Sequence, residues 1–454
     1  MNTRSSRSRL FALLIVLHTS APWCSALADD VLPGPRDCFW TRGPVSGDPY
    51  INVAYPDTAT FYWAAVFTMP EGTKLRLEGN FPHARYMSFI SYDGAGRPIE
   101  SLPDYLIEPA TGSVNPYIAG SDRETPKRQY QVEILNSDAP DNQPVGMQLF
   151  GRSREVLHTP EYGKEPGQQV IVYRIYVVDE GQDETGGAGL PQPVLVMNDG
   201  TTIRGPDICK TLRTMQPLQL DPAALAVPLE KYRELLKAAA RISPLHPSTN
   251  PPTWYQQLDR KALYGIYTGE LAAPDARKSE GGFYPNLDNQ YIRTILNRGH
   301  GPVFVLRAKA PTTPRTHGGQ PEMGEGQLRY WSWCSNQGFA NTRVNDCVHD
   351  EKIPVGPDGY YTLVVSRAAD RPRNAVAKCG VAWLPMADDG DGAGDENVTI
   401  LQLRHMLGTR DFPNAIQGIR STNSIKKDMG EYFPRGRYMT RSAFEVAMPC
   451  INPA

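Results

Sequence analysis

A succession of short strand-like segments occurs twice in this chain, and this repeat constrains the fold more than any other feature. In the first half the segments are apolar or alternating, and they cover residues 74–84, 85–93, 128–135, 145–151 and 168–179. In the second half similar segments follow in the same order, at residues 302–314, 329–336, 360–367, 380–386 and 397–407. Alternation with a period of two and many β-branched or aromatic residues indicate strands. The chain is therefore predicted to be mainly β.

Polar residues recur at matched places in the two sets of strands. The pairs are Arg85 with Arg329, Tyr86 with Tyr330, Ser88 with Ser332, Asp104 with Asp346 and Arg174 with Arg404. Strand propensity alone does not require the same charged residue at the same place. We therefore predict two tandem, internally duplicated β-sandwich or jelly-roll-like domains. The alternative stays open that two antiparallel sheets resemble each other because strands reuse the same residue types.

The segment between the two halves has a different pattern. Residues 228–242 carry apolar side chains at helical spacing, Pro228 suits a helix start, and prolines follow the segment. Residues 253–269 are a second candidate helix. The predicted organisation is a signal peptide at 1–28, an N-terminal β domain at 29–215, a partly helical connector at 216–300 and a C-terminal β domain at 301–454.

The first 28 residues have the pattern of a secretory signal peptide. Three arginines precede the apolar run at 10–17, and Ala26-Leu27-Ala28 offers the small residues of a cleavage site. The run is too short to span a bilayer, and no later segment offers a membrane span. We expect a soluble protein that is secreted or periplasmic after cleavage.

Charge argues against nucleic acid as a partner. The chain has 47 Lys and Arg and 49 Asp and Glu, and removing the three Arg of the signal peptide leaves 44 basic residues against 49 acidic ones. The resulting charge of −5 does not favour binding to a phosphate backbone. A small-molecule ligand is the partner that we expect, and the oligomeric state is left open.

The cysteine count fits an oxidising compartment. Seven cysteines are present, and removal of the signal peptide takes away Cys24 and leaves an even number. Six cysteines in an exported chain indicate three disulfides, although the sequence cannot choose among 15 pairings. The pairs that we expect are Cys38–Cys209, Cys334–Cys347 and Cys379–Cys450. The wide spacings without C-x-x-C make metal binding by these residues a poor alternative.

The matched arginines are the most informative candidates for a site. Arg174 and Arg404 interrupt segments that otherwise look buried, and a buried guanidinium needs a partner. One interpretation is an internal ion pair in each half, Arg174 with Asp104 and Arg404 with Asp346. The other is a site for an anion or carboxylate that uses the guanidinium fork and the neighbouring tyrosines. The candidate ligand-binding residues are Arg85, Tyr86, Arg174, Arg329, Tyr330 and Arg404.

Whether the protein is an enzyme stays open. The chain lacks the G-x-S-x-G, H-E-x-x-H, P-loop and dinucleotide-binding signatures. His83 and Asp104 are weak catalytic candidates, and with Arg85 and Arg174 they form the alternative hypothesis of an exported hydrolase or lyase.

An acidic segment offers weak candidates for calcium binding. Asp389, Asp391 and Asp395 place oxygen ligands at alternate positions, but Ala393 and Ile400 stand where a calcium loop needs ligands. A solvated turn between two strands is the favoured interpretation. No metal and no cofactor are therefore expected.

Several longer motifs, taken in order, resemble a family of secreted bacterial proteins of unknown function. They are ARYMSF, GSVNPYIAG, YRIYVVDEGQDETGGAGLPQP, RVNDCVHDE, CGVAWLP and MGEYFPRGRY. The resemblance implies an exported, predominantly β protein and supplies no activity. Because the matched Arg, Asp and Tyr residues occur without a recognisable catalytic signature, we expect a binding protein for a small organic acid, a glycan or a lipid-like molecule, with an envelope protein-interaction module as a further alternative.

Overall fold

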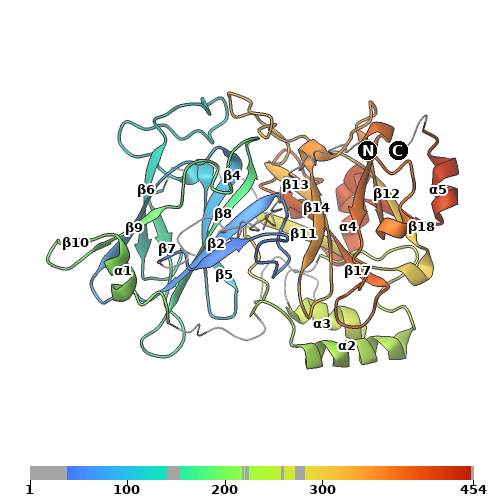
Figure 1. Cartoon of the computed structure of the whole chain (residues 1–454), viewed down its shortest axis with the longest axis horizontal. Coiled ribbons are helices and arrows are strands. Elements are labelled where there is room, and N and C mark those ends of the chain that lie inside the picture. Colours follow the sequence, from blue (N-terminus) through green and yellow to red (C-terminus); the bar gives the residue numbers. More distant parts are fainter. Residues whose placement is uncertain are drawn as a thin grey trace, which may run out of the picture. The chain divides into compact units, whose positions relative to one another are not determined.

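The described residues form four β-sheets, which pack in pairs as two sandwiches (Figure 1). This computed structural model describes residues 38–140, 154–216, 219, 224–256, 260–270 and 282–450. The predicted signal peptide at 1–28 and the predicted strand at 145–151 lie outside the described residues.

The N-terminal sandwich contains strands β1 to β10. Its first sheet has the order β1 (Arg42–Val45), β2 (Thr60–Phe67), β8 (Gln169–Val178), β4 (Ala84–Tyr92) and β5 (Pro98–Pro103). Its second sheet has the order β10 (Thr202–Ile203), β9 (Gln192–Val196), β3 (Lys74–Asn80), β6 (Gln129–Leu135) and β7 (Val156–His158).

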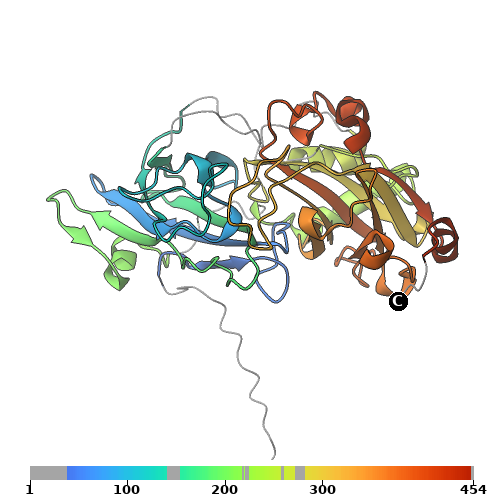
Figure 2. The ribbon, with the colours of Figure 1, turned by 90° about the horizontal axis from the view of Figure 1, so that it is seen from above.

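The C-terminal sandwich contains strands β11 to β18. Its first sheet has the order β11 (Asn289–Asn297), β17 (Val398–Met406), β13 (Tyr330–Asn336) and β14 (Val344–His349). Its second sheet has the order β16 (Val381–Pro385), β15 (Tyr360–Ser366), β12 (Val303–Lys309) and β18 (Arg435–Met439). In Figure 2 the yellow to red strands belong to this sandwich and the blue to green strands to the other.

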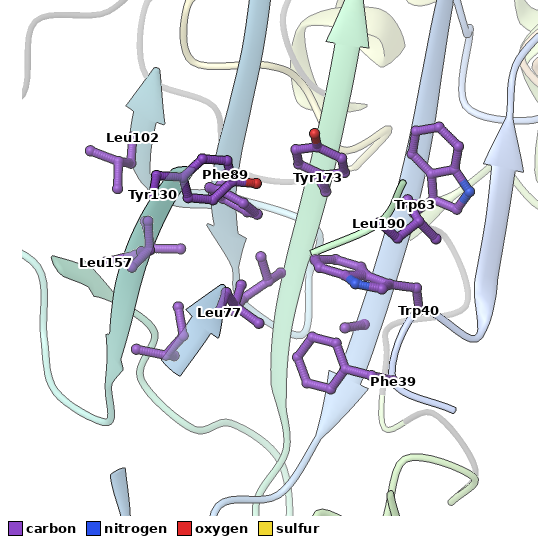
Figure 3. Packing of buried hydrophobic residues seen from close by; sticks show 14 of the residues in the cluster. Phe39, Trp40, Trp63, Leu77, Phe89, Leu102, Tyr130, Leu157, Tyr173 and Leu190 are labelled. Atoms are coloured by element: carbon purple, nitrogen blue, oxygen red, sulfur yellow. The ribbon is translucent and has the colours of Figure 1, made fainter. Parts of the chain in front are cut away.

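Aromatic side chains fill the space between the two sheets of each sandwich. In the N-terminal core the ring of Phe89 lies 5.0 Å from that of Tyr173 in the same sheet and 5.9 Å from that of Tyr130 in the facing sheet (Figure 3). In the C-terminal core the rings of Trp331 and Tyr361 are 5.0 Å apart across the sheets. Since side chains alternate along a strand, these residues leave the opposite face of each first sheet for other contacts.

The two sandwiches repeat one strand order, as the sequence predicted. Strands β2 to β9 correspond in chain order to β11 to β18, and the pairing β2-β8-β4-β5 recurs as β11-β17-β13-β14. The pairing β9-β3-β6-β7 recurs as β18-β12-β15-β16, and in both copies the last two strands are parallel. A shared parallel pair within otherwise antiparallel sheets is a specific feature, so the duplicated mainly β architecture is confirmed.

The register agrees with the predicted residue matches. Arg174 lies opposite Ser88 on one side and Tyr62 on the other. Arg404 lies opposite Ser332 and Tyr291 in the same way. Tyr62 and Tyr291 are therefore equivalent positions, as are Arg174 and Arg404.

Helices lie between and after the two sets of strands. Helices α2 (Leu229–Ile242) and α3 (Arg260–Thr268) lie side by side within residues 216–300, and α2 buries Tyr232, Leu235 and Ala239 at helical spacing (Figure 1). Strand β11 also begins in this range and pairs in the C-terminal sandwich. The exact domain boundaries stay a prediction. The other α-helices among the described residues are α1 (Pro206–Thr211), α4 (Ile425–Met429) and α5 (Arg441–Ala447).

Three disulfides confirm the expected pairing. They join Cys38 to Cys209, Cys334 to Cys347 and Cys379 to Cys450. Among the described residues, no helix combines the length and the apolar character that a membrane crossing requires.

Candidate functional site

Ion pairs join the two sandwiches where they pack against each other. Arg85 in β4 donates to both carboxylate oxygens of Asp350 at 2.5 and 2.6 Å, and it also contacts Glu351. In return, Arg329 of the C-terminal sandwich lies 3.4 Å from the carboxylate of Asp104. All of these charged groups except Glu351 are buried. Each half thus supplies the acid that neutralises the matched arginine of the other half.

The acid equivalent to Asp104 is Asp350, and the predicted match with Asp346 is wrong. Asp104 and Asp350 each directly follow the last strand of their first sheet. Asp104 accepts the backbone N–H of Met87, and Asp350 accepts that of the equivalent Trp331. Asp346 lies inside β14 instead, because the sequence match assigned to a loop a segment that is a strand.

The pKa values of the two equivalent acids are shifted in opposite directions. Burial raises the pKa of Asp104 to about 7, although Arg329 and the backbone N–H groups of Met87 and Tyr105 act against this rise. Burial also opposes ionisation of Asp350, but Arg85 and His349 outweigh it and hold the pKa of Asp350 below its ordinary value. The difference agrees with the closer contact that Arg85 makes.

A cavity of about 200 Å³ lies against the outer faces of β2, β8, β11 and β17. Its walls are largely apolar or aromatic, but three buried guanidinium groups reach it, those of Arg174, Arg293 and Arg404. Ile51 and Leu225 also line it and are 38% and 39% exposed, which places its mouth near them. The described residues that line the cavity include no Asp, Glu, His or Cys.

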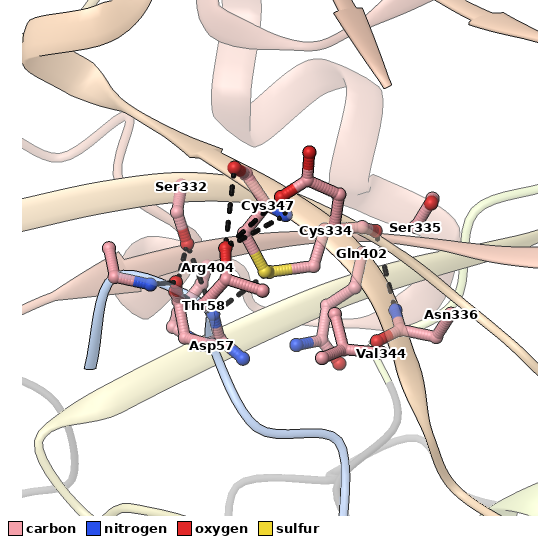
Figure 4. Close-up of a disulfide and its surroundings, with 12 residues drawn as sticks. Asp57, Thr58, Ser332, Cys334, Ser335, Asn336, Val344, Cys347, Gln402 and Arg404 are labelled. Carbon is pink, nitrogen blue, oxygen red and sulfur yellow. Dashed lines mark hydrogen bonds and ion pairs between the residues drawn. A yellow bond between two sulfur atoms is a disulfide. The ribbon is translucent and has the colours of Figure 1, made fainter. Parts of the chain in front are cut away.

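Arg404 is neutralised within the protein (Figure 4). Its guanidinium donates to the carboxylate of Asp57, which is fully buried. The same oxygen of Asp57 accepts the hydroxyls of Tyr330 at 2.7 Å and Ser332 at 2.6 Å. Arg404 also donates to the backbone oxygen of Tyr55 at 3.4 Å. This arginine is therefore paired with a buried carboxylate, although its Nε atom has no hydrogen-bond partner among the described residues.

Arg174 has no such acid. Its side chain is 4% exposed and donates to the backbone oxygen of Tyr284 at 3.1 Å, and it lies over the rings of Tyr62 and Tyr92 at 5.2 and 5.4 Å. Within the part of the chain that the structure describes, Arg174 forms no ion pair, and its Nη1 atom has no hydrogen-bond partner. Burial acts to lower the pKa of Arg174, but the surrounding tyrosines outweigh it and raise this pKa. A buried cation in this state is costly unless something else supplies the negative charge.

The missing acid is explained by the duplication. The loop before β2 has the sequence Tyr55-Pro56-Asp57, and the loop before β11 has Tyr284-Pro285-Asn286. The backbone oxygens of Tyr55 and Tyr284 accept from Arg404 and Arg174, respectively. The Oδ1 atoms of residues 57 and 286 both accept a backbone N–H two positions later, at 3.0 and 2.9 Å. Asn286 thus occupies the place of Asp57 but carries no charge.

The carboxylate nearest to Asn286 in the sequence accepts hydrogen bonds from groups other than Arg174. Asp288, two residues after Asn286, accepts the hydroxyl of Ser101 at 2.6 Å and also that of Tyr86. The charge of Arg174 lowers the pKa of Asp288, but burial outweighs this effect and raises it. The amide nitrogen of Asn286 donates to the hydroxyl of Tyr176 at 3.3 Å. The position equivalent to Asp57 therefore carries an amide beside Arg174, while Tyr86, the equivalent of Tyr330, donates to Asp288.

The predicted ion pairs within each half are wrong. Asp104 lies beside Arg329 and not Arg174, and Arg404 binds Asp57 and not Asp346. The physical reason is that Arg174 and Arg404 project from the outer faces of their sheets. The groups that contact them there come from a loop of the other half of the chain. Of the six candidate ligand-binding residues, Arg174 and Arg404 line the cavity, whereas Arg85, Tyr86, Arg329 and Tyr330 are bound in the buried contact.

The catalytic candidates do not come together. His83 contacts the guanidinium of Arg128 at 2.6 Å, and burial together with that charge lowers the pKa of His83. Asp104 lies beside Arg329, and no hydrogen bond joins it to His83 among the described residues. Neither residue lines the cavity. The alternative site of a hydrolase or lyase therefore has no geometric support.

The acidic segment forms a hydrogen-bonded turn. Asp391 is buried and accepts the N–H groups of Ala393 and Asp395 and the hydroxyl of Tyr232, while Asp389 accepts from Gln337. The described residues contain one group of three possible metal ligands, namely Asp57, Cys334 and Cys347. Two of these are joined in a disulfide, so they offer no thiolate.

Sequence reasoning missed most of the cavity wall. The lining residues Asn286, Arg293 and Gln402 were not among the candidates, and neither was Asp57, the partner of Arg404. The Tyr-Pro-Asp and Tyr-Pro-Asn triplets are the signal that reveals the two loops, because each precedes the first strand of its copy by the same number of residues.

Comparison with known proteins gives little further information. No protein-family model and no curated protein matches the chain. A putative uncharacterized protein from Burkholderia cenocepacia aligns with a TM-score of 0.42 and 11% identity over 86% of this chain and 79% of that chain. The VPA0106 protein from Vibrio parahaemolyticus aligns with a TM-score of 0.38 and 13% identity over 85% of this chain and 90% of that chain. Neither similarity is close enough to assign a function, and the resemblance to a secreted family stays a prediction.

Proposed function

We propose that this protein is an exported binding protein for a small organic acid, which it holds in the cavity with its carboxylate on Arg174. The observation that carries the proposal is the unpaired charge of Arg174 in a cavity whose equivalent arginine, Arg404, is neutralised by Asp57. A bound carboxylate would stand where the side chain of an aspartate at position 286 would otherwise lie.

The chemistry of the cavity favours a carboxylate over other ligands. A guanidinium fork matches the two oxygens of a carboxylate, and the bond is stronger in an apolar surrounding. The volume of about 200 Å³ is somewhat larger than the engineered cavity of about 150 Å³ that holds benzene. The ligand is therefore a molecule of about the size of a substituted benzene, and a large glycan does not fit.

The lining residues favour binding over catalysis, and the disulfides favour a location outside the cytosol. Because the described lining residues lack a carboxylate, an imidazole and a thiol, the cavity offers little for acid–base or nucleophilic catalysis. Three disulfides are typical of secreted or periplasmic proteins. Export through the predicted signal peptide is part of the proposal.

The test supplies the missing acid from the protein itself. In Asn286→Asp, a carboxylate beside Arg174 takes the place of the ligand, whereas Asn286→Ser keeps an acceptor for the loop without a charge. Isothermal calorimetry with benzoate, phenylacetate and hexanoate measures binding to the three proteins. We expect Asn286→Ser to bind these acids at least about ten times more tightly than Asn286→Asp, since a charged hydrogen bond is worth about 1.5–3 kcal/mol. Equal binding by the two variants, or no binding by the unchanged protein, contradicts the proposal.

A further inference from the structure

The two walls of the cavity differ in polarity at equivalent positions. Ala64 lies opposite Val172 in the β2–β8 pair, and both line the cavity. The equivalent positions in the β11–β17 pair are Arg293 and Gln402, which lie opposite each other and also line the cavity. One copy thus places two apolar side chains where the other places a guanidinium and an amide. At this pair of positions the β2–β8 wall is apolar and the β11–β17 wall is polar.

The polar wall contains hydrogen-bond donors. Gln402 is 1% exposed, and its Oε1 atom accepts from the Nε of Arg293, which identifies Nε2 as the remaining atom of the amide. This Nε2 atom has no hydrogen-bond partner among the described residues. The guanidinium of Arg293 lies over the rings of Tyr55 and Tyr291, at 5.0 and 5.6 Å.

A buried amide donor without an acceptor is costly, and protein interiors rarely leave one. Burial also lowers the pKa of Arg293 to about 10, in agreement with a cation held in apolar surroundings. An acceptor oxygen in the cavity would satisfy the Nε2 atom of Gln402. Arg174, on the opposite wall, would at the same time bind a carboxylate.

We infer that the ligand is an organic acid with a second oxygen acceptor at the end remote from its carboxylate, such as a hydroxyl, a carbonyl or a second carboxylate. This inference rests on the proposed function. The first carboxylate lies on Arg174, the apolar body lies against Ala64 and Val172, and the second acceptor receives a hydrogen bond from Gln402. A fatty acid or a simple aromatic acid leaves the polar wall unsatisfied and is not the preferred ligand.

The test compares acids of equal length with and without the second acceptor. Calorimetry measures the affinities of hexanoate, 6-hydroxyhexanoate and adipate for the unchanged protein, for Gln402→Leu and for Gln131→Leu. Gln131 is an exposed residue of β6, remote from the lining residues, and serves as the matched control. We expect the unchanged protein and Gln131→Leu to bind 6-hydroxyhexanoate or adipate at least about ten times more tightly than hexanoate. In Gln402→Leu this ratio should fall to about one.

The possible outcomes separate the two proposals. If hexanoate binds in an Arg174-dependent manner but the second acceptor brings no gain, this inference fails and the proposed function stands. If the gain persists in Gln402→Leu, the polar wall is not the second contact, and the inference fails as well. If none of the acids binds the unchanged protein, both fail. If Gln402→Leu does not fold, Gln402→Glu provides a second test. Its carboxylate beside Arg293 should weaken the binding of adipate more than the binding of hexanoate.

Discussion

The same substitution should destabilise the protein much more at Arg404 than at the equivalent Arg174. In Arg404→Met, the fully buried carboxylate of Asp57 loses its cation, and breaking a buried pair in this way costs about 3–5 kcal/mol. In Arg174→Met no carboxylate is left behind. The protein loses one charged hydrogen bond to Tyr284, worth about 1.5–3 kcal/mol, and two cation–π contacts of about 0.5–2 kcal/mol each.

Against these losses stands the desolvation of an unpaired guanidinium, which costs several kcal/mol. The gains and losses in stability at Arg174 therefore nearly cancel. We expect the free energy of unfolding of Arg174→Met to lie within about 1 kcal/mol of that of the unchanged protein. The difference between the two variants should be about 3 kcal/mol. Urea unfolding at pH 7, followed by tryptophan fluorescence with the disulfides intact, measures both free energies.

The comparison has a clear refuting result. If Arg174→Met loses as much stability as Arg404→Met, Arg174 is a structural residue whose charge is satisfied within the protein, and the cavity has no unused cation. A further measurement uses the ligand: an acid at 100 times its dissociation constant should stabilise the unchanged protein by about 2.7 kcal/mol and Arg174→Met much less.

Two further predictions concern the contact between the sandwiches and a disulfide. Because the folded-state pKa of Asp104 is about 7 and therefore raised, its contribution to stability is largest below about pH 4 and declines up to pH 7, and Asp104→Asn should remove this decline in urea unfolding between pH 4 and 7. The pKa of Asp350 is lowered, so its contribution exists above about pH 4 and is lost as the pH falls, and Asp350→Asn should be destabilised most at neutral pH. Replacing Cys334 and Cys347 together by Ala should cost about 2–4 kcal/mol by the same assay, since their bond closes a loop with a sequence separation of 13. A pH-independent difference for either acid, or an unchanged stability without the disulfide, contradicts the respective prediction.

Much of the fold is readable in the sequence because its signals are local. Alternating apolar residues mark strands wherever they stand, so the order of the strands repeats visibly in the chain. The equivalence of Arg174 and Arg404 follows from their places in the last long strand of each set, and the register agrees with it. The prediction that these two arginines are buried is confirmed for the same reason.

The partners of the arginines are not readable in this way, because they depend on which faces meet. The sequence comparison placed both partners of each predicted ion pair in the same half of the chain. In the structure, Arg85 binds Asp350 and Arg329 lies beside Asp104, so these contacts join the two halves. Strand periodicity says which side chains share a face, and it does not say what covers that face. Asp57 in particular stands in a loop and gave no periodic signal at all.

The exchanged contacts have the form of an isologous interface, in which residue i of one copy meets residue j of the other and the reverse also holds. In a symmetric dimer of identical halves both equivalent loops would carry the same residue, so both arginines would be neutralised by Asp or both would be left with Asn. A single chain that holds both copies is free of this restriction. It keeps Asp57 on Arg404, which stabilises the contact, and places Asn286 at Arg174, where we propose that a carboxylate ligand binds. Under the proposed function, Asn286→Asp is the substitution that restores the symmetry and occupies the place of the ligand's carboxylate.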